Sequence, residues 1–453
     1  MTPPDAVLGA SVLLSFRAAN VRSFREQFEF SMLGTRVSEQ SVVRQVAWKR
    51  TGSPLSVLPA AGIFGANASG KSNLLRAMDD MRAHVLHSFR SGSPTGGVPR
   101  RPFMLDPGSR NAPSVFEVDL VLRGVRHNYG FSVNGEEFLE EWATAYPEGR
   151  PVRLFHREGE HVDLGRRDRT TGRAVASLLR PNALYLSTAA SANHKGLLPL
   201  FSWFERNLLL AEANDRHLRQ ALTADFLDDP NRRVQVLDLL RSADLGITGA
   251  SRRDLDPTTR DKLVKVVRIL AGEEPEMEAS ESLVALDQLV ALVHRGAEGE
   301  IELDPSEESL GTMVWFGLVG PVVQALNLGC VLLADELDAS LHPALTMRLI
   351  QLFQDPETNP LRAQLIFNSH DATLLGDSTG DRLLGRDQIW FTEKRSDGST
   401  RLYPLSDLAP RRQEAVASRY LQGRYGAVPL LSQLQFRFPG QQLTLDAEHV
   451  PSD

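Results

Sequence analysis

The sequence predicts an α/β protein with a mixed central sheet around a phosphate-binding loop, an antiparallel β-meander and an inserted helical lobe. Three patterns indicate this fold. An apolar run at 61–64 breaks into a loop bounded by Gly65 and Gly70. A second apolar run, 331–334, ends in two acidic residues, as expected of a buried parallel strand. Between them, alternating apolar and polar residues at 115–133 predict two paired strands.

Composition is that of an ordinary soluble protein with room for two or three domains, because 42% of the 453 residues are hydrophobic and 24% are charged. No apolar run approaches the roughly 20 residues that span a bilayer, and no basic region precedes an apolar one at the N-terminus. We therefore expect a cytoplasmic protein without a membrane partner. The net charge of −7 argues against wrapping nucleic acid over the whole surface, although a local basic stripe stays open.

The N-terminal part of the body is assigned to residues 1–195. Alternation at 13–20 and again at 27–30 predicts a β-hairpin that leads into the strand before the loop. Further strands of the meander are expected at 115–122, 125–133, 138–146 and 152–156. These strands would pack beside the phosphate-binding loop.

The middle of the chain is expected to be a helical lobe over residues 196–280. Apolar residues recur near helical spacing across 197–270, and sustained heptads are absent, which argues against a long coiled-coil arm. Residues 281–453 form the C-terminal part of the body. This part would begin with a hairpin made by 283–294 and 300–303.

The glycine-bounded loop has the pattern G-x-x-x-x-G-K-S of a P-loop. Its glycines allow backbone dihedrals closed to other residues, so that N–H groups can turn inward around an anion. Lys71 would reach the β- and γ-phosphates of ATP, and Ser72 would offer its hydroxyl to Mg²⁺. A helix from Asn73 onward would point its positive end at the phosphates. The expected nucleotide-binding residues are Gly65, Ala66, Asn67, Ala68, Ser69, Gly70, Lys71, Ser72 and Asn73.

The acid pair after the second apolar run predicts a Walker B element beside the P-loop strand. Asp335 would hold Mg²⁺, directly or through water. Glu336 would orient or deprotonate the attacking water, because phosphoryl transfer depends on an in-line nucleophile and charge neutralisation. A solvated strand edge is the alternative, and the upstream P-loop favours the catalytic interpretation.

Two more positions could face the phosphates. A strand predicted at 363–367 ends just before His370, which could reach the γ-phosphate or could be a surface or capping histidine. Ser309 and Gly311 stand at the start of an apolar helix. They would present a hydroxyl, free N–H groups and a positive helix end to a phosphate, or Ser309 would be an ordinary N-cap.

The order P-loop, Ser-x-Gly-Thr helix start, acid pair and strand-end histidine resembles the ABC-type ATPase head of SMC, RecF and overcoming-lysogenisation-defect proteins. The resemblance implies an ATPase that sandwiches ATP and Mg²⁺ between two heads, in a homodimer or higher homo-oligomer. Ser309 and Gly311 would contact the γ-phosphate held by the partner's Lys71. Asp338 would lie at the dimer seam, and His370 would be the switch histidine.

A closer likeness is to the stand-alone ATPases of bacterial phage-defence and abortive-infection operons, of the AbiL and RloA type. It is carried by 20–24, 64–67, 102–105, 335–343 and 420–426. It implies regulation of a separately encoded effector, often a Toprim-type nuclease.

Two features limit the match and leave alternatives open. No glutamine in a Q-loop setting is identified before Ser309, and no acidic cluster for a fused nuclease follows His370. The alternatives are a RecF-like or SMC-like DNA-repair ATPase and a nucleotide-gated scaffold with negligible hydrolysis.

Overall fold

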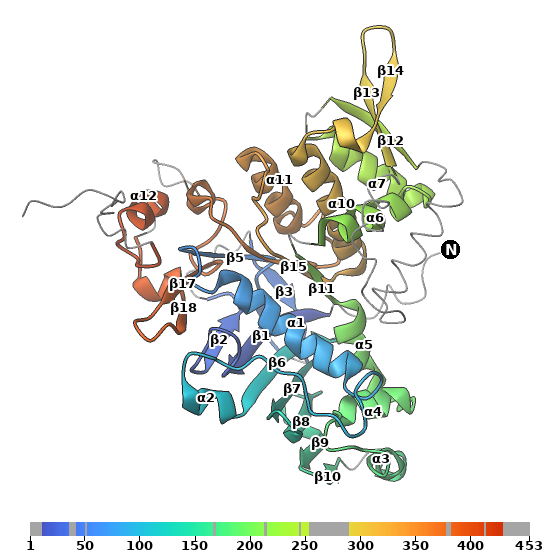
Figure 1. The fold of residues 1–453 in the computed structure, drawn as a ribbon, viewed down its shortest axis with the longest axis vertical. Helices are drawn as coiled ribbons and strands as arrows, with labels where there is room; N and C mark the ends of the chain where they lie inside the picture. Colours follow the sequence, from blue (N-terminus) through green and yellow to red (C-terminus); the bar gives the residue numbers. More distant parts are fainter. Residues whose placement is uncertain are drawn as a thin grey trace, which may run out of the picture.

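The structure is a computed structural model, and it describes residues 11–35, 42–49, 52–165, 169–212, 215–243, 246–252, 290–376, 382–411 and 414–428. In these ranges the chain forms two large sheets, with helices packed between and around them (Figure 1). The predicted α/β class, with a mixed central sheet and an antiparallel meander, is confirmed.

The mixed sheet has the strand order β11-β15-β16-β5-β17-β18. Its strands are β11 (Leu208–Ala211), β15 (Val331–Ala334), β16 (Gln364–Asn368), β5 (Ala60–Gly65), β17 (Ile389–Lys394) and β18 (Thr400–Pro404). All neighbours are parallel except β17 and β18. The Walker B strand, β15, was expected beside the P-loop strand, β5, and the two strands are not neighbours. Strand β16 lies between them.

The second sheet is antiparallel throughout, in the order β10-β9-β8-β7-β6-β1-β2. Its strands are β1 (Val12–Ala19), β2 (Phe28–Ser31), β6 (Ser114–Leu122), β7 (Val125–Val133), β8 (Phe138–Tyr146), β9 (Val152–Glu158) and β10 (His161–Leu164). Both the N-terminal hairpin and the meander are therefore confirmed. A separate pair, β3 (Arg44–Val46) and β4 (Leu55–Val57), leads into β5.

Helix α1 (Lys71–His87) starts at the P-loop and packs between the two sheets (Figure 1). One apolar cluster joins its buried Leu74 to Ile63 of the mixed sheet and to Phe131 of the meander. His84 lies edge-on to three phenylalanine rings of the meander, and burial lowers the pKa of its imidazole to about 4. Three shorter helices contribute to the same core: α3 (Arg169–Ala176), α4 (Tyr185–Ser191) and α5 (Leu198–Arg206). Helix α2 (Pro107–Asn111) precedes β6.

The other face of the mixed sheet is covered by α6 (Arg216–Phe226), α7 (Pro230–Arg241), α10 (Leu310–Leu328) and α11 (Pro343–Gln354). The inserted helical lobe expected over residues 196–280 contains the helices α5, α6 and α7, but it also contains strands. Strand β11 belongs to the mixed sheet, and 253–280 lie outside the described residues. Helices α6 and α7 share one apolar cluster with α10.

Helix α10 corrects the expectation that no segment could cross a membrane. Among the described helices, α10 alone is long and apolar enough to do so by length and composition. However, 67% of its most apolar window is buried inside the protein. A helix buried to this extent has the character of a core helix.

A small sheet of β12 (Ile247–Arg252), β13 (Val290–Arg295) and β14 (Glu300–Leu303) projects beyond α7 (Figure 1). It contains the predicted hairpin from residue 290 onward, whereas 283–289 lie outside the described residues. The remaining short helices are η2 (Pro305–Glu307), η3 (Ala372–Leu375), η4 (Leu405–Leu408) and α12 (Val416–Leu421).

The last described segment, 414–428, packs against β17, the strand that pairs with the P-loop strand. Phe391 of β17 pairs in register with Phe64 of β5. Tyr420 and Tyr425 stack on the Phe391 ring, with centroids 5.4 and 5.9 Å away. Tyr403 fixes this arrangement, because its hydroxyl donates to the Tyr425 carbonyl oxygen at 2.7 Å.

Candidate nucleotide-binding site

Threonine hydroxyls of β17 and β18 contact the P-loop and fix its position. The Ser69 hydroxyl lies 2.6 Å from that of Thr392. Thr400 Oγ1 lies 2.8 Å from both the Ser69 carbonyl oxygen and the Ser23 hydroxyl. Gly70 has a φ of 107°, and a Cβ there would lie 2.3 Å from Thr400 Oγ1. The second glycine of the motif is therefore required both by backbone conformation and by close packing.

Lys71 is a buried cation, with only 5% of its surface exposed. Its ammonium donates to the carbonyl oxygens of Gly65 (2.8 Å) and Ala66 (3.1 Å). Within the described ranges no carboxylate forms an ion pair with it. Burial lowers its pKa to about 8, and the acids at 335, 336 and 338 oppose this shift. A buried ammonium without a carboxylate partner is suited to a phosphate anion.

The acid pair lies across from the P-loop at the carboxyl ends of the strands. Asp335 is 5% exposed, and its Oδ1 accepts from Asn368 Nδ2 at 2.5 Å. The same Nδ2 donates to Ser72 Oγ at 3.1 Å, so that the hydroxyl and the carboxylate share one donor. Oxygen ligands of this kind are those Mg²⁺ prefers, and the residues present therefore fit a magnesium ion.

Glu336 is exposed, unlike its neighbour Asp335, and it lines a cavity that also borders the P-loop. Its backbone is left-handed, with a φ of 53°, and its N–H donates to Asn368 Oδ1. This conformation turns the chain sharply after β15. The Glu336 carboxylate can therefore face the cavity, while that of Asp335 is held inside.

Two charged residues beside Asp335, Arg76 and Glu212, were not predicted from the sequence. Arg76 on α1 donates to Glu212 at 2.7 Å and lies 3.5 Å from Asp335 Oδ2. Glu212 follows β11, whose last residue, Ala211, pairs in register with Ala334. Glu212 thus stands at the strand end beside Asp335. The available signal was an apolar run at 208–211 followed by an acid, as at 331–335.

His370 and Asp338 are brought together near the lysine. His370 Nδ1 lies 3.3 Å from Lys71 Nζ. The backbone N–H of His370 donates to Asp338 Oδ2 at 3.1 Å. The structure therefore places His370 beside Lys71, and its role as a switch histidine stays a prediction. The loop that carries Asp338 is tied to the strand end that carries His370.

Ser309 and Gly311 start α10 and do not line the cavity of their own chain. The Ser309 hydroxyl caps the helix by accepting from the Thr312 N–H at 3.0 Å, and Ser309 is exposed. A Cβ on Gly311 would lie 2.8 Å from the Ser340 carbonyl oxygen, so the helix start packs closely on the loop after Asp338.

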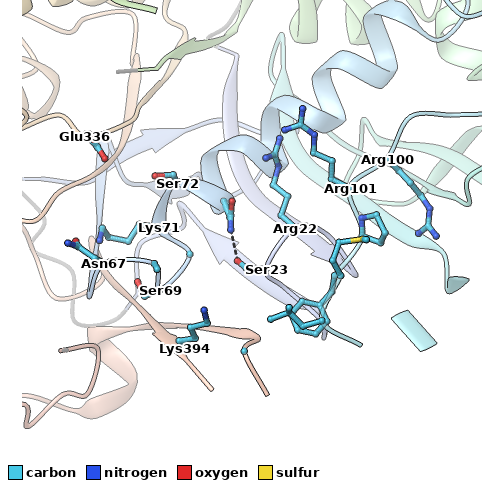
Figure 2. A pocket seen from close by; sticks show the side chains of 18 of the residues that line it. Arg22, Ser23, Asn67, Ser69, Lys71, Ser72, Arg100, Arg101, Glu336 and Lys394 are labelled. Carbon is cyan, nitrogen blue, oxygen red and sulfur yellow. Dashed lines mark hydrogen bonds between the residues drawn. The ribbon is translucent and has the colours of Figure 1, made fainter. Parts of the chain in front are cut away.

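One cavity of about 890 Å³ gathers most of the predicted residues (Figure 2). Asn67, Lys71 and Glu336 lie toward one end of the view, and Arg100 lies at the other. The predicted residues that line this cavity are Asn67, Ala68, Ser69, Gly70, Lys71, Ser72, Asn73, Glu336 and His370.

The remaining wall of the cavity was not assigned from the sequence. It is basic and partly apolar, and it consists of Arg22, Ser23, Arg100, Arg101, Pro102, Phe103, Met104, Leu105, Lys394 and Gly398. Arg22 is fixed by two hydrogen bonds to Asp80, of 2.5 and 2.7 Å. Met104 and Leu105 are more than half exposed. A wall that combines cations with apolar surface suits the ribose and base of a nucleotide whose phosphates lie at the P-loop.

Comparison with known families agrees with this geometry. The family model described as "AAA domain, putative AbiEii toxin, Type IV TA system" matches residues 60–376, from the P-loop strand to η3. The chain belongs to this family. It is accordingly a P-loop protein of an ATPase family. No curated protein sequence matches the chain significantly.

Among solved structures, SMC heads are similar. One is an SMC head bound to the C-terminal winged-helix domain of ScpA, which is 12% identical in sequence. The match covers 86% of this chain and 97% of the SMC head, with a TM-score of 0.38. The SMC head domain from Thermotoga maritima is 13% identical, with coverages of 86% and 98% and a TM-score of 0.36. A head with an extended coiled coil, bound to the C-terminal domain of ScpA from Pyrococcus furiosus, is 11% identical, with coverages of 92% and 100% and a TM-score of 0.36. The functional assignment does not depend on these distant similarities.

Proposed function

We propose that this protein is an ABC-type ATPase that hydrolyses ATP to ADP and phosphate with Mg²⁺. The observation that carries the proposal is the buried Lys71 ammonium, which has carbonyl oxygens but no carboxylate partner in the described ranges. It faces the cavity into which Glu336 also projects. A binding protein needs only the cation, whereas an exposed carboxylate opposite it supplies a base for water.

Each residue has a separate task in this proposal. Lys71 and the P-loop N–H groups bind the β- and γ-phosphates, and Ser72 with Asp335 would hold Mg²⁺. The ion would neutralise charge on the phosphate oxygens. Glu336 accepts the proton of the attacking water, and His370 lies within reach of the γ-phosphate region beside Lys71.

The proposal includes a homodimer or higher homo-oligomer formed around ATP. Ser309 is exposed at a helix N-terminus and does not line the cavity of its own chain, so this capped, positive helix end is accessible to a second molecule. The Gly311 contact with Ser340 links this helix start to the loop of Asp338. The surface offered to a partner is therefore coupled to the strand end that carries His370.

We further propose a cytoplasmic role in phage defence, in which ATP-driven assembly controls a separately encoded effector. The support is the likeness to AbiL-type and RloA-type ATPases and membership in a family whose name refers to a toxin–antitoxin system. The effector is proposed to be a nuclease of the Toprim type. Nucleic acid is not a required partner in this proposal, since the chain carries a net charge of −7.

The test uses the full chain and two substitutions. Glu336→Gln should retain ATP binding and slow hydrolysis on the order of 10²-fold or more, because it removes a positioned base. In that background, Ser309→Arg should keep nucleotide binding and abolish the ATP-dependent dimer measured by light scattering.

Matched controls are available close by. Glu357→Gln changes another exposed acid, and Ser306→Arg changes an exposed serine on η2, three residues before Ser309. Both should behave like the parent chain. Hydrolysis at the parent rate in Glu336→Gln would refute the assignment of the base. An unchanged dimer in Ser309→Arg would refute the sandwich.

A further inference from the structure

We infer that Asn368 is a positioning residue that joins the two Mg²⁺ ligands and the backbone of the catalytic glutamate into one unit. The inference rests on the proposed function and assigns a role to a residue for which the sequence motifs give none. Asn368 is the last residue of β16, and it is 1% exposed.

The strand order explains why one residue can reach all three groups. Strand β16 lies between β5, which leads to Ser72, and β15, which leads to Asp335 and Glu336. Parallel strands end at the same edge of a sheet, so the side chain at the end of the middle strand lies between the loops that follow its neighbours.

The amide of Asn368 is used on both sides. Nδ2 donates to Ser72 Oγ at 3.1 Å and to Asp335 Oδ1 at 2.5 Å, which occupies both of its hydrogens. Oδ1 accepts the N–H of Glu336. No other side-chain type of this length supplies two donors and one acceptor in a plane.

These bonds have two consequences for the site. The donors approach Ser72 and Asp335 through oxygen lone pairs, so they fix the orientation of both metal ligands, as outer hydrogen bonds do in metal sites generally. The acceptor holds Glu336 in its left-handed backbone, with a φ of 53°, a conformation that is unfavourable for a residue with a side chain. Ligand geometry and base placement therefore depend on the same amide.

A purely structural role is the competing explanation, and the same strand provides its control. Gln364, at the start of β16, is also a buried amide, 2% exposed. It makes three hydrogen bonds, all with the backbone of Leu13 and Leu58. Loss of Gln364 should affect stability alone, because its partners lie outside the cavity.

The experiment compares Asn368→Leu with Gln364→Met in the full chain. The first readout is the free Mg²⁺ concentration that gives half of the ATP-induced thermal stabilisation, and it needs no hydrolysis. The second is ATP affinity in EDTA. For Asn368→Leu we expect the Mg²⁺ midpoint to rise at least about tenfold and kcat to fall by a similar factor, as for other outer-sphere substitutions. ATP affinity in EDTA should change less than about threefold, and Gln364→Met should keep the parent values.

Asn368→Thr is a second variant that keeps the inference testable if Asn368→Leu does not fold. Its single hydroxyl can replace only part of the network, so we expect an intermediate rise of the Mg²⁺ midpoint. If both Asn368 variants keep the parent Mg²⁺ midpoint and kcat, the inference is refuted while the ATPase proposal stands. If the parent chain itself shows no Mg²⁺-dependent ATP binding, the proposed function fails first.

Discussion

Lys71→Met should stabilise the nucleotide-free protein at neutral pH while removing its ability to bind ATP. Burial lowers the Lys71 pKa from 10.5 to about 8. At 1.36 kcal/mol for each pH unit, keeping this buried ammonium charged costs about 3 kcal/mol of folding free energy. The lost hydrogen bonds to Gly65 and Ala66 return part of the gain, since each is worth about 1 kcal/mol. We expect a net increase of about 1–2 kcal/mol.

The pH dependence gives this prediction its sign. Between about pH 8 and pH 10.5 the unfolded chain keeps the proton on Lys71 and the folded chain has lost it, so the stability contributed by this group rises with pH. The advantage of Lys71→Met over the parent should therefore shrink by about 2 kcal/mol between pH 7 and pH 9.5.

Urea unfolding of both chains at the two pH values measures the difference in their free energies of unfolding. The titration of other groups cancels in this difference because both chains contain them. Lys394→Met, at the same cavity but exposed, should change stability by less than about 0.5 kcal/mol. A Lys71→Met chain that is less stable than the parent at pH 7, with a gap that does not vary with pH, would refute this reasoning.

Two further substitutions test other parts of the fold. Gly311→Ala places a Cβ 2.8 Å from the Ser340 carbonyl oxygen, so it should displace the loop after Asp338 and weaken the ATP-dependent dimer in light scattering, with ATP affinity unchanged. Loss of nucleotide binding in this variant would show that the contact supports the chain's own cavity instead. Arg157 and Glu141 form a fully buried ion pair between β9 and β8, with Nη1 3.8 Å from Oε2. Arg157→Met leaves Glu141 buried without its cation and should lower the free energy of unfolding in urea by about 3–5 kcal/mol, whereas a cost below about 1 kcal/mol would mean that Glu141 needs no counterion.

The sequence predicted the parts of the fold that have strong local signals. The P-loop needs its glycines and lysine at fixed spacing, and the meander shows clear alternation, so both were found. Strand β11 was missed because its four residues stand between helical segments and become a strand only by pairing with β15. Local periodicity cannot decide the state of so short an apolar run.

The candidate site shows the same division. Lys71, Ser72, Asp335 and Glu336 belong to motifs with a fixed chemical meaning, and the structure brings them together. The signal for Glu212 is only an apolar run of four residues followed by an acid, and its place beside Asp335 becomes apparent from the strand order. Asn368 was visible as a polar residue at a strand end, but its three partners become apparent only when β16 is placed between β5 and β15.

The strand order also bears on how the protein is made. Residues 60–65 pair with 364–368 on one side and with 389–394 on the other, and the aromatic rings of 420 and 425 then cover the sheet. During synthesis the P-loop and the strand before it leave the ribosome early, and the strands that pair with that strand leave hundreds of codons later. A nascent or prematurely terminated chain therefore carries the motif without the strands that shape it, and the P-loop takes up its folded geometry only in nearly complete molecules.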